Sequence, residues 1–427
     1  MFCQLELLRQ CFPPSVRRIL EELPDSLDET YERILKEIRK PNQGYAHRLL
    51  QCLVVAVRPL QVEELAEVLA FDFNAEGIPK LNLGCRWGDQ EEAVMSACSS
   101  LVMIVNERNS RVVQFSHFSV KDFLTADRLV EPIRDVSRYH IRLEAAHTIL
   151  AQACLGVLLR LDDRVDRDSI KGFPLAEYAA RYWPTHARVE NVSPRIMDGM
   201  GCLFDAGKPH YAIWLSIYDE DQVRNPFSSI CPEAFAAPTA PLYYAAMLGL
   251  RDLAERLIAE HPVHINATGG YEKTPMHAAA SGGHTKILSL LIEHGVDVDC
   301  RGREGYTALH LTSQNGKLEA GKFLLDCGAD INARSWWYDK NCSPNPARYS
   351  TPLINAAYQG FIEYARMLLE RGAAIDARGH HGKTALHWAT IHGQHETVRL
   401  LLEHGADVNV RDESGYTPSR FASWQNH

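Results

Sequence analysis

The sequence predicts a mainly α-helical protein whose second half is a solenoid of stacked two-helix repeats. Three observations lead to this prediction: a six-residue phrase recurs at near-constant spacing, a glycine recurs in register with it, and leucine-rich helical patterns follow each glycine. The 427 residues are 46% hydrophobic and 23% charged, which is typical of a globular chain and excludes a disordered or fibrous one. The net charge of −9 provides no overall attraction to nucleic acid or to an anionic membrane.

The recurring phrase begins at six positions, with successive steps of 34, 33, 44, 33 and 33 residues. It reads APLYYA from Ala240, TPMHAA from Thr274, TALHLT from Thr307, TPLINA from Thr351, TALHWA from Thr384 and TPSRFA from Thr417. The glycine that separates the two helices of a repeat keeps the same register, at Gly249, Gly283, Gly316, Gly360 and Gly393. Two independent markers in one register predict five repeats and part of a sixth.

Each marker has a physical role. A threonine such as Thr274 or Thr351 can cap the first helix through its hydroxyl, and Pro275 or Pro352 suits the first turn, where its missing N–H would have no helical partner. The second helices have leucine-rich faces that end at glycines suited to a left-handed C-cap, at Gly295, Gly328, Gly372 and Gly405. One such unit cannot bury its apolar face alone, so we expect neighbouring units to stack.

On these motifs the chain resembles the ankyrin-repeat family over residues 239–427. The first repeat has Pro262 in place of the C-cap glycine and Glu272 in place of a finger glycine, so we expect a divergent capping repeat. The sixth ends at TPSRFASWQNH, which provides one helix without its partner. We interpret this ending as a chain cut short at its C-terminus.

The first half is predicted to hold a helical lead-in (1–41), a winged-helix domain (42–130) and a helical connector (131–238). The lead-in contains the amphipathic pattern LPDSLDETYERILKEIRK, with Asp25 or Ser26 as the cap. The connector contains long helical patterns at 139–161 and 174–189.

The winged helix is predicted from three helices followed by a hairpin. The helical patterns lie at 45–57, 62–71 and 92–100, and the turn RPLQ joins the first two. The strand patterns LVMIVNE and RVVQFS follow, separated by turn residues Asn109 and Ser110, and a further helix begins at Ser119.

Six phrases in this order resemble the region that follows the NTPase domain of fungal NACHT-type, NLR-like STAND proteins: LPDSLDETYERIL, RPLQVEELAEVLA, FSHFSVKDFL, PLAEYAARYWPTHA, HYAIWLSIYDED and APLYYAA. In that family, a helical segment and a winged helix of the GPI inositol-deacylase type connect the NTPase to C-terminal ankyrin repeats. The resemblance implies a cytoplasmic signalling receptor whose repeats sense a ligand or protein partner and whose NTPase drives assembly.

The phosphate-binding motif of such an NTPase is missing, because no G-x-x-x-x-G-K-[ST] loop occurs. We therefore expect no nucleotide hydrolysis and no cofactor, and we interpret the chain as a truncated gene product or a natural fragment. His117 stands where the family has the histidine that faces the β-phosphate of ADP, although Phe118 replaces the aspartate that follows. The resemblance implies a nucleotide sensor at His117 if an NTPase is present. The alternative is a buried structural histidine that bonds a backbone carbonyl.

The sequence predicts no enzyme. It contains no G-x-S-x-G nucleophile elbow, and nothing places an oxyanion hole near Ser116, His117, Ser119 and Asp122.

The eleven cysteines form no C-x-x-C pair, which argues against zinc knuckles and a disulfide framework and indicates a reducing compartment. A zinc site at His387, His392 and His395 is not expected either, because His387 holds the fourth position of T-x-L-H.

A winged helix raises DNA binding, and hence transcriptional regulation, as an alternative function. Residues 61–100 contain eight acidic residues against Lys80 and Arg86, a net charge of −6 that would repel phosphate.

The longest apolar run, LLQCLVVAV, is about half the roughly 20 residues that span a bilayer. No secretory signal is visible. We therefore expect a cytoplasmic protein with protein partners, without nucleic acid binding or membrane insertion.

The predicted binding surface consists of the finger tips and first-helix faces of the repeats. The 44-residue step places an insertion, SWWYDKNCSPNPARYS, in the finger between the third and fourth repeats. Its aromatic residues Trp336, Trp337 and Tyr338 are predicted to contact a partner, or alternatively to fold back on an adjacent finger. Comparable finger positions predict a basic rim for an acidic partner, or alternatively solvated side chains, at Arg301, Arg303, Arg334, Arg378, His380 and His381.

Overall fold

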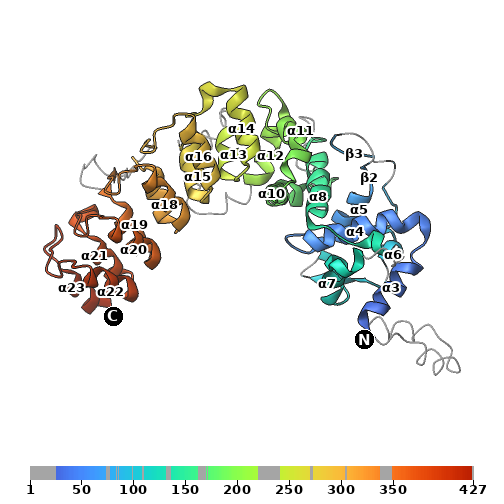
Figure 1. Cartoon of the computed structure of the whole chain (residues 1–427), viewed down its shortest axis with the longest axis horizontal. Coiled ribbons are helices and arrows are strands. Elements are labelled where there is room, and N and C mark those ends of the chain that lie inside the picture. Colours follow the sequence, from blue (N-terminus) through green and yellow to red (C-terminus); the bar gives the residue numbers. More distant parts are fainter. Residues whose placement is uncertain are drawn as a thin grey trace. The chain divides into compact units, whose positions relative to one another are not determined.

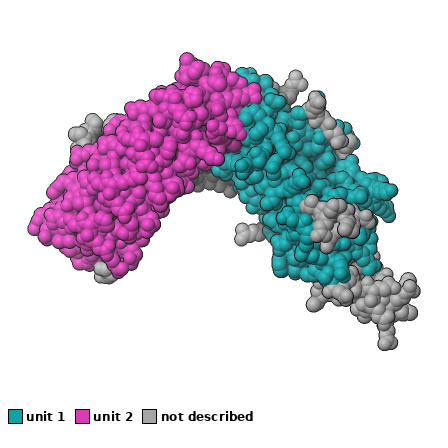
Figure 2. Space-filling view, viewed as in Figure 1, with its two compact units in different colours: residues 1–228 teal, residues 229–427 magenta. Residues whose placement is uncertain are grey.

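The computed structural model describes residues 26–73, 77–82, 84, 86–98, 100–107, 110–130, 136–161, 170, 172–219, 241–269, 273–302, 305–336 and 349–425. These residues are mainly helical, with a few short strands, which confirms the predicted fold class (Figure 1). The chain divides into two compact units, residues 1–228 and 229–427, drawn in teal and magenta in Figure 2. Among the described residues, no helix is long and apolar enough to cross a membrane.

The first unit begins with an amphipathic helix and a winged helix. Its helices are α3 (Leu27–Glu37), α4 (Gln43–Val55), α5 (Val62–Leu69), α6 (Gln90–Cys98) and α7 (Ser119–Thr125). Its three-stranded antiparallel sheet has the order β1, β5, β4, formed by Leu60–Gln61, Ser110–Phe115 and Val102–Glu107. Along the chain, a short strand, β1, follows α4, the helices α5 and α6 come next, and the hairpin of β4 and β5 comes last. This is the order of elements in a winged helix. Ser26 caps α3 by accepting a hydrogen bond from the Glu29 amide at 3.2 Å, as the sequence indicated.

Two details of this domain differ from the prediction. The segment RPLQ is not only a turn, because Leu60 pairs with Val113 and Gln61 with Val112, so that β1 becomes one edge strand of the sheet. A second small antiparallel pair, β2 (Phe71–Asp72) and β3 (Lys80–Leu81), lies between α5 and α6. Both strands have only two residues, too few for a periodic pattern to reveal.

The connector of the first unit consists of further packed helices. The described ones are α8 (Leu143–Leu158), α10 (Ala176–Ala187), α11 (Ser193–Leu203) and α12 (Pro209–Asp219). Aromatic side chains form their core: Trp183 and Trp214 are fully buried with ring centroids 6.3 Å apart, and Phe204 packs against both. The indole of Trp214 donates a hydrogen bond to the Ala180 carbonyl at 3.0 Å.

Buried polar contacts join the winged helix to the connector. Glu67 of α5 pairs with Arg86 and accepts a hydrogen bond from the Leu175 amide at 2.8 Å. The Val57 amide donates to the Tyr178 hydroxyl at 3.1 Å. These contacts satisfy groups that would otherwise be buried without partners, so the two segments form one unit.

The second unit is a stack of helix pairs. Its pairs are α13 (Pro241–Met247) with α14 (Arg251–Glu260), α15 (Pro275–Gly282) with α16 (Thr285–Glu293), α17 (Ala308–Gln314) with α18 (Leu318–Asp326), α19 (Pro352–Gln359) with α20 (Ile362–Glu370), and α21 (Ala385–Ile391) with α22 (His395–Glu403); α23 (Pro418–Gln425) follows. Each first helix contacts the first helix of the next repeat, and the second helices form a parallel layer (Figure 1).

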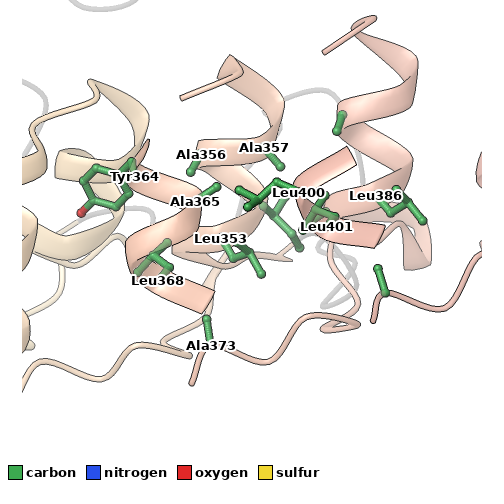
Figure 3. Packing of buried hydrophobic residues seen from close by; sticks show 14 of the residues in the cluster. Leu353, Ala356, Ala357, Tyr364, Ala365, Leu368, Ala373, Leu386, Leu400 and Leu401 are labelled. Atoms are coloured by element: carbon green, nitrogen blue, oxygen red, sulfur yellow. The ribbon is translucent and has the colours of Figure 1, made fainter. Parts of the chain in front are cut away.

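The core of this unit lies between the two helix layers. Figure 3 shows Leu353 of α19, Leu368 of α20 and Leu401 of α22 among the buried side chains that fill it, with alanines where the helices approach closely. Leu353, Leu368 and Leu401 are at most 2% exposed. Each such side chain contributes about 1.5–3 kcal/mol when buried, so stacking provides the stability that a single repeat lacks.

The local signals of the repeats have the expected geometry. The hydroxyl of Thr351 accepts a hydrogen bond from the Ile354 amide at 3.3 Å and so caps α19. Gly283 and Gly295 have positive φ angles of 77° and 84°, which are strained for residues with a side chain. In the first repeat, Pro262 opens a 3₁₀ turn (Pro262–His264) in place of the glycine C-cap.

Candidate protein-binding surface of the repeats

The histidines of the T-x-L-H phrases are structural. His277, His310 and His387 are fully buried, and each Nδ1 lies 2.8–3.0 Å from the hydroxyl of the capping threonine. The Nε2 atoms lie 2.8–3.2 Å from carbonyl oxygens of the next repeat, those of Tyr306, Ser350 and Tyr416. Because the threonine amide donates to Nδ1, the proton sits on Nε2 and is donated to the carbonyl.

Each of these histidines therefore connects two consecutive repeats. Both ring nitrogens are occupied by hydrogen bonds, which leaves neither for a metal. Among the described residues, no group of three or more metal-ligating side chains occurs.

The fingers are joined by a ladder of side-chain to backbone hydrogen bonds. Asp299 accepts from the Asp330 amide at 2.9 Å, Asn332 from the Ala374 amide at 2.8 Å, and Asp376 from the Asp407 amide at 3.2 Å. The acceptors occupy equivalent positions in successive fingers. The ladder fixes the spacing of the fingers and hence the positions of the side chains beside it.

The predicted basic rim has a structural role in addition to its charge. Arg301 donates from Nη1 to the carbonyl of Arg334 at 2.6 Å, and Arg378 donates in the same way to the carbonyl of Arg411 at 3.0 Å. The guanidinium of Arg334 lies 4.7 Å from the centre of the Tyr349 ring. These three arginines are exposed to solvent, and the contacts above hold their side chains in place.

The two predicted histidines of the rim lie together. The rings of His380 and His381 stack with centroids 3.8 Å apart, and His381 has a positive φ of 55°. Nδ1 of His381 lies 3.8 Å from a carboxylate oxygen of Glu413, so an acidic side chain stands beside the two rings.

The insertion between the third and fourth repeats is described only at its base. Ser335 and Trp336 form β6, which pairs antiparallel with β7 (Tyr349–Ser350) and closes the insertion. Trp337 and Tyr338, like Arg303 in the preceding finger, lie outside the described residues.

A second group of aromatic side chains was not singled out from the sequence. We call it the aromatic cluster: Tyr358 on α19, Trp388 on α21, His392 at the C-cap of α21, and His380 in the adjacent finger. The ring of Tyr358 lies 4.2 Å from that of His392 and 5.6 Å from that of Trp388, and Trp388 lies 6.5 Å from His380. Tyr358 is 42% exposed, and His392 is exposed as well.

The indole N–H of Trp388 is buried without a hydrogen-bond partner among the described residues. The signal that could have revealed the cluster is positional: Trp388 follows T-x-L-H directly, and Tyr358 and His392 lie at the C-terminal end of the first helix of their repeats.

The described residues of the winged helix form no comparable basic surface. Its third helix, α6, which corresponds to the recognition helix of DNA-binding members, begins with Gln90, Glu91 and Glu92. Arg111 of β5 is bound to Glu91 at 2.7 Å and to Glu63 at 3.1 Å. The face is therefore acidic where a DNA reader needs positive charge.

His117 is exposed, and its Nδ1 lies 2.7 Å from the Ser119 hydroxyl. The expectation of a buried histidine bonded to a backbone carbonyl is thus wrong, because the residue lies in the turn after β5, beside the 78% exposed Phe118. Ser116 donates to the Ser100 carbonyl at 3.1 Å.

Comparison with known proteins agrees with this geometry. Residues 242–335 and 337–412 match the family described as ankyrin repeats (3 copies), and residues 31–133 match the GPI inositol-deacylase, winged helix domain. The chain thus contains ankyrin repeats and a winged helix of the GPI inositol-deacylase type.

Three curated proteins illustrate the similarity. The chain is 30% identical over 292 residues, 64% of its own length, to the azaphilone pigments biosynthesis cluster protein L of Monascus ruber. It spans 60% of that relative's length. Shorter matches are to alpha-latrocrustotoxin-Lt1a of Latrodectus tredecimguttatus, with 38% identity over 52 residues, which are 12% of this chain and 4% of the toxin. The apicidin F cluster transcription factor apf2 of Gibberella fujikuroi is 43% identical over 44 residues, 10% of this chain and 11% of that protein.

Proposed function

We propose that this chain is a non-enzymatic protein-interaction module that holds a protein partner on the first helices and fingers of its fourth and fifth repeats. The single observation that carries the proposal is the aromatic cluster, which is fixed on the stacked helices and has Tyr358 and His392 exposed to solvent. Ankyrin repeats as a class suggest protein interaction. The cluster adds a definite location to that general role.

The chemistry of the cluster fits an interface centre. Aromatic side chains dominate binding hot spots because they bury a large area at a small loss of conformational entropy. The orphan indole N–H of Trp388 would gain a hydrogen bond from a carbonyl or carboxylate oxygen of a partner. Arg334 and Arg378 make no ion pair with a described carboxylate, so the flanking charge favours an acidic segment.

In a wider context, we propose that the chain is the sensor and coupling part of an NLR-like STAND receptor in the cytoplasm. The order of winged helix and ankyrin repeats supports this proposal. If a P-loop domain is joined upstream, the whole protein becomes a nucleotide-gated switch, and His117 would face the nucleotide. The printed name of the Monascus ruber relative places that protein in a pigment biosynthesis cluster and specifies no partner.

The partner proposal can be tested by proximity labelling in the source organism with the full chain fused to a biotin ligase. Tyr358→Ala with Trp388→Ala should remove a reproducible subset of labelled proteins. Tyr45→Ala is the matched control, because Tyr45 is equally exposed at 41% but lies on α4. Tyr358→Ala alone covers the case in which the double variant unfolds.

A candidate partner identified by this labelling is then purified, and its affinity for the purified chain is measured directly. This measurement decides whether the partner binds at the aromatic cluster. Equal affinity for the wild type and a folded cluster variant would refute the proposed location. A parallel double variant of Trp336 and Trp337 tests the insertion separately. Mapping the transcript ends tests the receptor proposal, because an in-frame upstream P-loop is required for it.

A further inference from the structure

A cavity of about 410 Å³ opens in the first unit, between α4 and the start of α8. It is independent of the repeat surface. Its lining consists of His47 and Gln51 from α4, Ser137 and His140 from a 3₁₀ turn (Ser137–Tyr139) and its C-cap, and Arg142 and Ala145 from the beginning of α8. The volume lies within the range of small-molecule sites.

The polar groups of this cavity have few partners within the protein. Gln51 is only 6% exposed, yet its carboxamide makes no hydrogen bond to any described residue. Nε2 of His47 is buried without a partner in the described part of the chain. The side chains of Ser137, His140 and Arg142 likewise form no hydrogen bond or ion pair with described residues.

Buried polar groups in folded proteins are almost always bonded, so the buried carboxamide of Gln51 and Nε2 of His47 favour a bound group at this position.

Among the described residues that line the cavity, Arg142 carries a positive charge, two side chains are imidazoles, and none is a carboxylate. Burial lowers the pKa of His47 and the neighbouring Arg48 lowers it further, whereas a hydrogen bond with the backbone of His140 opposes the shift. The hydroxyl of the buried Tyr139, whose ring lies 6.1 Å from that of His47, is also without a partner. A bound anion would pair with the guanidinium of Arg142 and accept hydrogen bonds from the unsatisfied donors.

We propose that this cavity binds a small anion that carries a phosphate group. A guanidinium, imidazoles, a carboxamide and a hydroxyl offer donors from several directions, which suits the three terminal oxygens of a phosphate ester better than the two of a carboxylate. The cavity is also lined from both segments of the unit, since α4 belongs to the winged helix and α8 to the connector. Bound ligand would therefore stabilise their junction.

The test uses the full chain and calorimetric titration with inorganic phosphate and glycerol 3-phosphate, with malonate as the carboxylate comparison at equal ionic strength. Saturable binding of either phosphate probe is expected. Arg142→Gln and His140→Gln should each weaken it by about tenfold or more, because each removes a donor to a charged oxygen.

Arg138→Gln is the matched control, because Arg138 lies in the same turn but donates to the Gln43 carboxamide at 2.7 Å and does not line the cavity. The affinity of Arg138→Gln for the phosphate probes should equal that of the wild type.

Three results would overturn the proposal: no saturable binding of the two phosphate probes at millimolar concentration, equal binding of malonate, or equal losses in Arg142→Gln and Arg138→Gln. Circular dichroism establishes that each variant is folded. Arg142 is exposed, so Arg142→Gln decides the matter even if His140→Gln fails to fold.

Discussion

The hydroxyl of Tyr364 lies 2.7 Å from the hydroxyl of Thr312 and joins the fourth repeat to the third. Thr312 donates its own proton to the Leu309 carbonyl at 3.0 Å, so Tyr364 must be the donor between the two hydroxyls. Figure 3 shows the Tyr364 ring directed toward the preceding repeat, away from the leucines of its own core. Gly321 of α18 leaves room for this hydroxyl, which a Cβ atom there would overlap.

Tyr364→Phe should therefore destabilise the junction of the third and fourth repeats by about 1 kcal/mol, because a buried acceptor loses its partner while the ring still fills the same volume. Gly321→Ala should cost about 1–3 kcal/mol through overpacking. Hydrogen exchange of amides in α17 and α20 measures both effects. Tyr358→Phe is the control with an exposed hydroxyl, and equal exchange rates in Tyr364→Phe and Tyr358→Phe would contradict the assignment.

Acid should destabilise the repeats through their buried histidines. Burial lowers the pKa of His310 to about 4, and it lowers the pKa values of His277 and His387 as well. A lowered pKa means that the unfolded chain takes up protons first as the pH falls. The stability due to the neutral histidines is therefore complete above pH 6.5, the ordinary value, and declines between pH 6.5 and about 4.

For His310 alone, the free energy of unfolding should fall by roughly 3 kcal/mol at the acid end of this pH range. Urea unfolding of the full chain at a series of pH values measures it. His310→Ile, which places the residue type of the fourth repeat, Ile354, at this position, should be less stable at neutral pH but less sensitive to acid. Parallel stability curves for the wild type and His310→Ile would show that His310 is not responsible.

Glu67 should be the most sensitive charged residue of the first unit. It is 2% exposed, and burial raises its pKa even though the Leu175 amide and Arg86 both favour the ionised form. Glu67→Ala leaves both partners unsatisfied and should cost about 2–4 kcal/mol in thermal or urea unfolding. Glu67→Gln keeps an acceptor for the amide and should cost less.

Glu91→Gln provides the comparison, because the Glu91 side chain is 48% exposed in its pair with Arg111 and should change stability by less than about 1 kcal/mol. Similar losses of stability in Glu67→Ala and Glu91→Gln would mean that the buried contacts of Glu67 are unimportant.

The fold was predictable where its cause is local. Ser26, Thr351 and the C-cap glycines act within one turn of their own helix, and the sequence displays them directly. The strand at Leu60 was missed because it exists only through pairing with Val113, a residue far along the chain. No window of neighbouring residues contains that information.

The candidate site was predictable only in part, for the same reason. The position of Arg378 in a finger indicated exposure, but its acceptor is a carbonyl of the next finger. Tyr358 and Trp388 belong to different repeats and meet only when α19 and α21 stack. The cavity is a stronger case, because His47 and His140 approach through the packing of α4 against α8, and neither segment has a binding motif.

The full chain should not bind duplex DNA, even at low salt. Non-specific DNA affinity comes from positive side chains that displace counterions, and α6 instead presents Glu91 and Glu92. Arg111, the nearby cation on β5, is already neutralised by Glu63 and Glu91. Fluorescence anisotropy with a labelled duplex over a range of salt concentrations measures this.

The anisotropy of the labelled duplex is expected to stay constant as the wild-type protein is added, at every salt concentration. Glu91→Gln with Glu92→Gln provides a sensitive comparison, because removing two negative charges should produce at most weak, salt-dependent binding. Tight binding by the wild type that weakens steeply with salt would instead revive transcriptional regulation as the function of the winged helix.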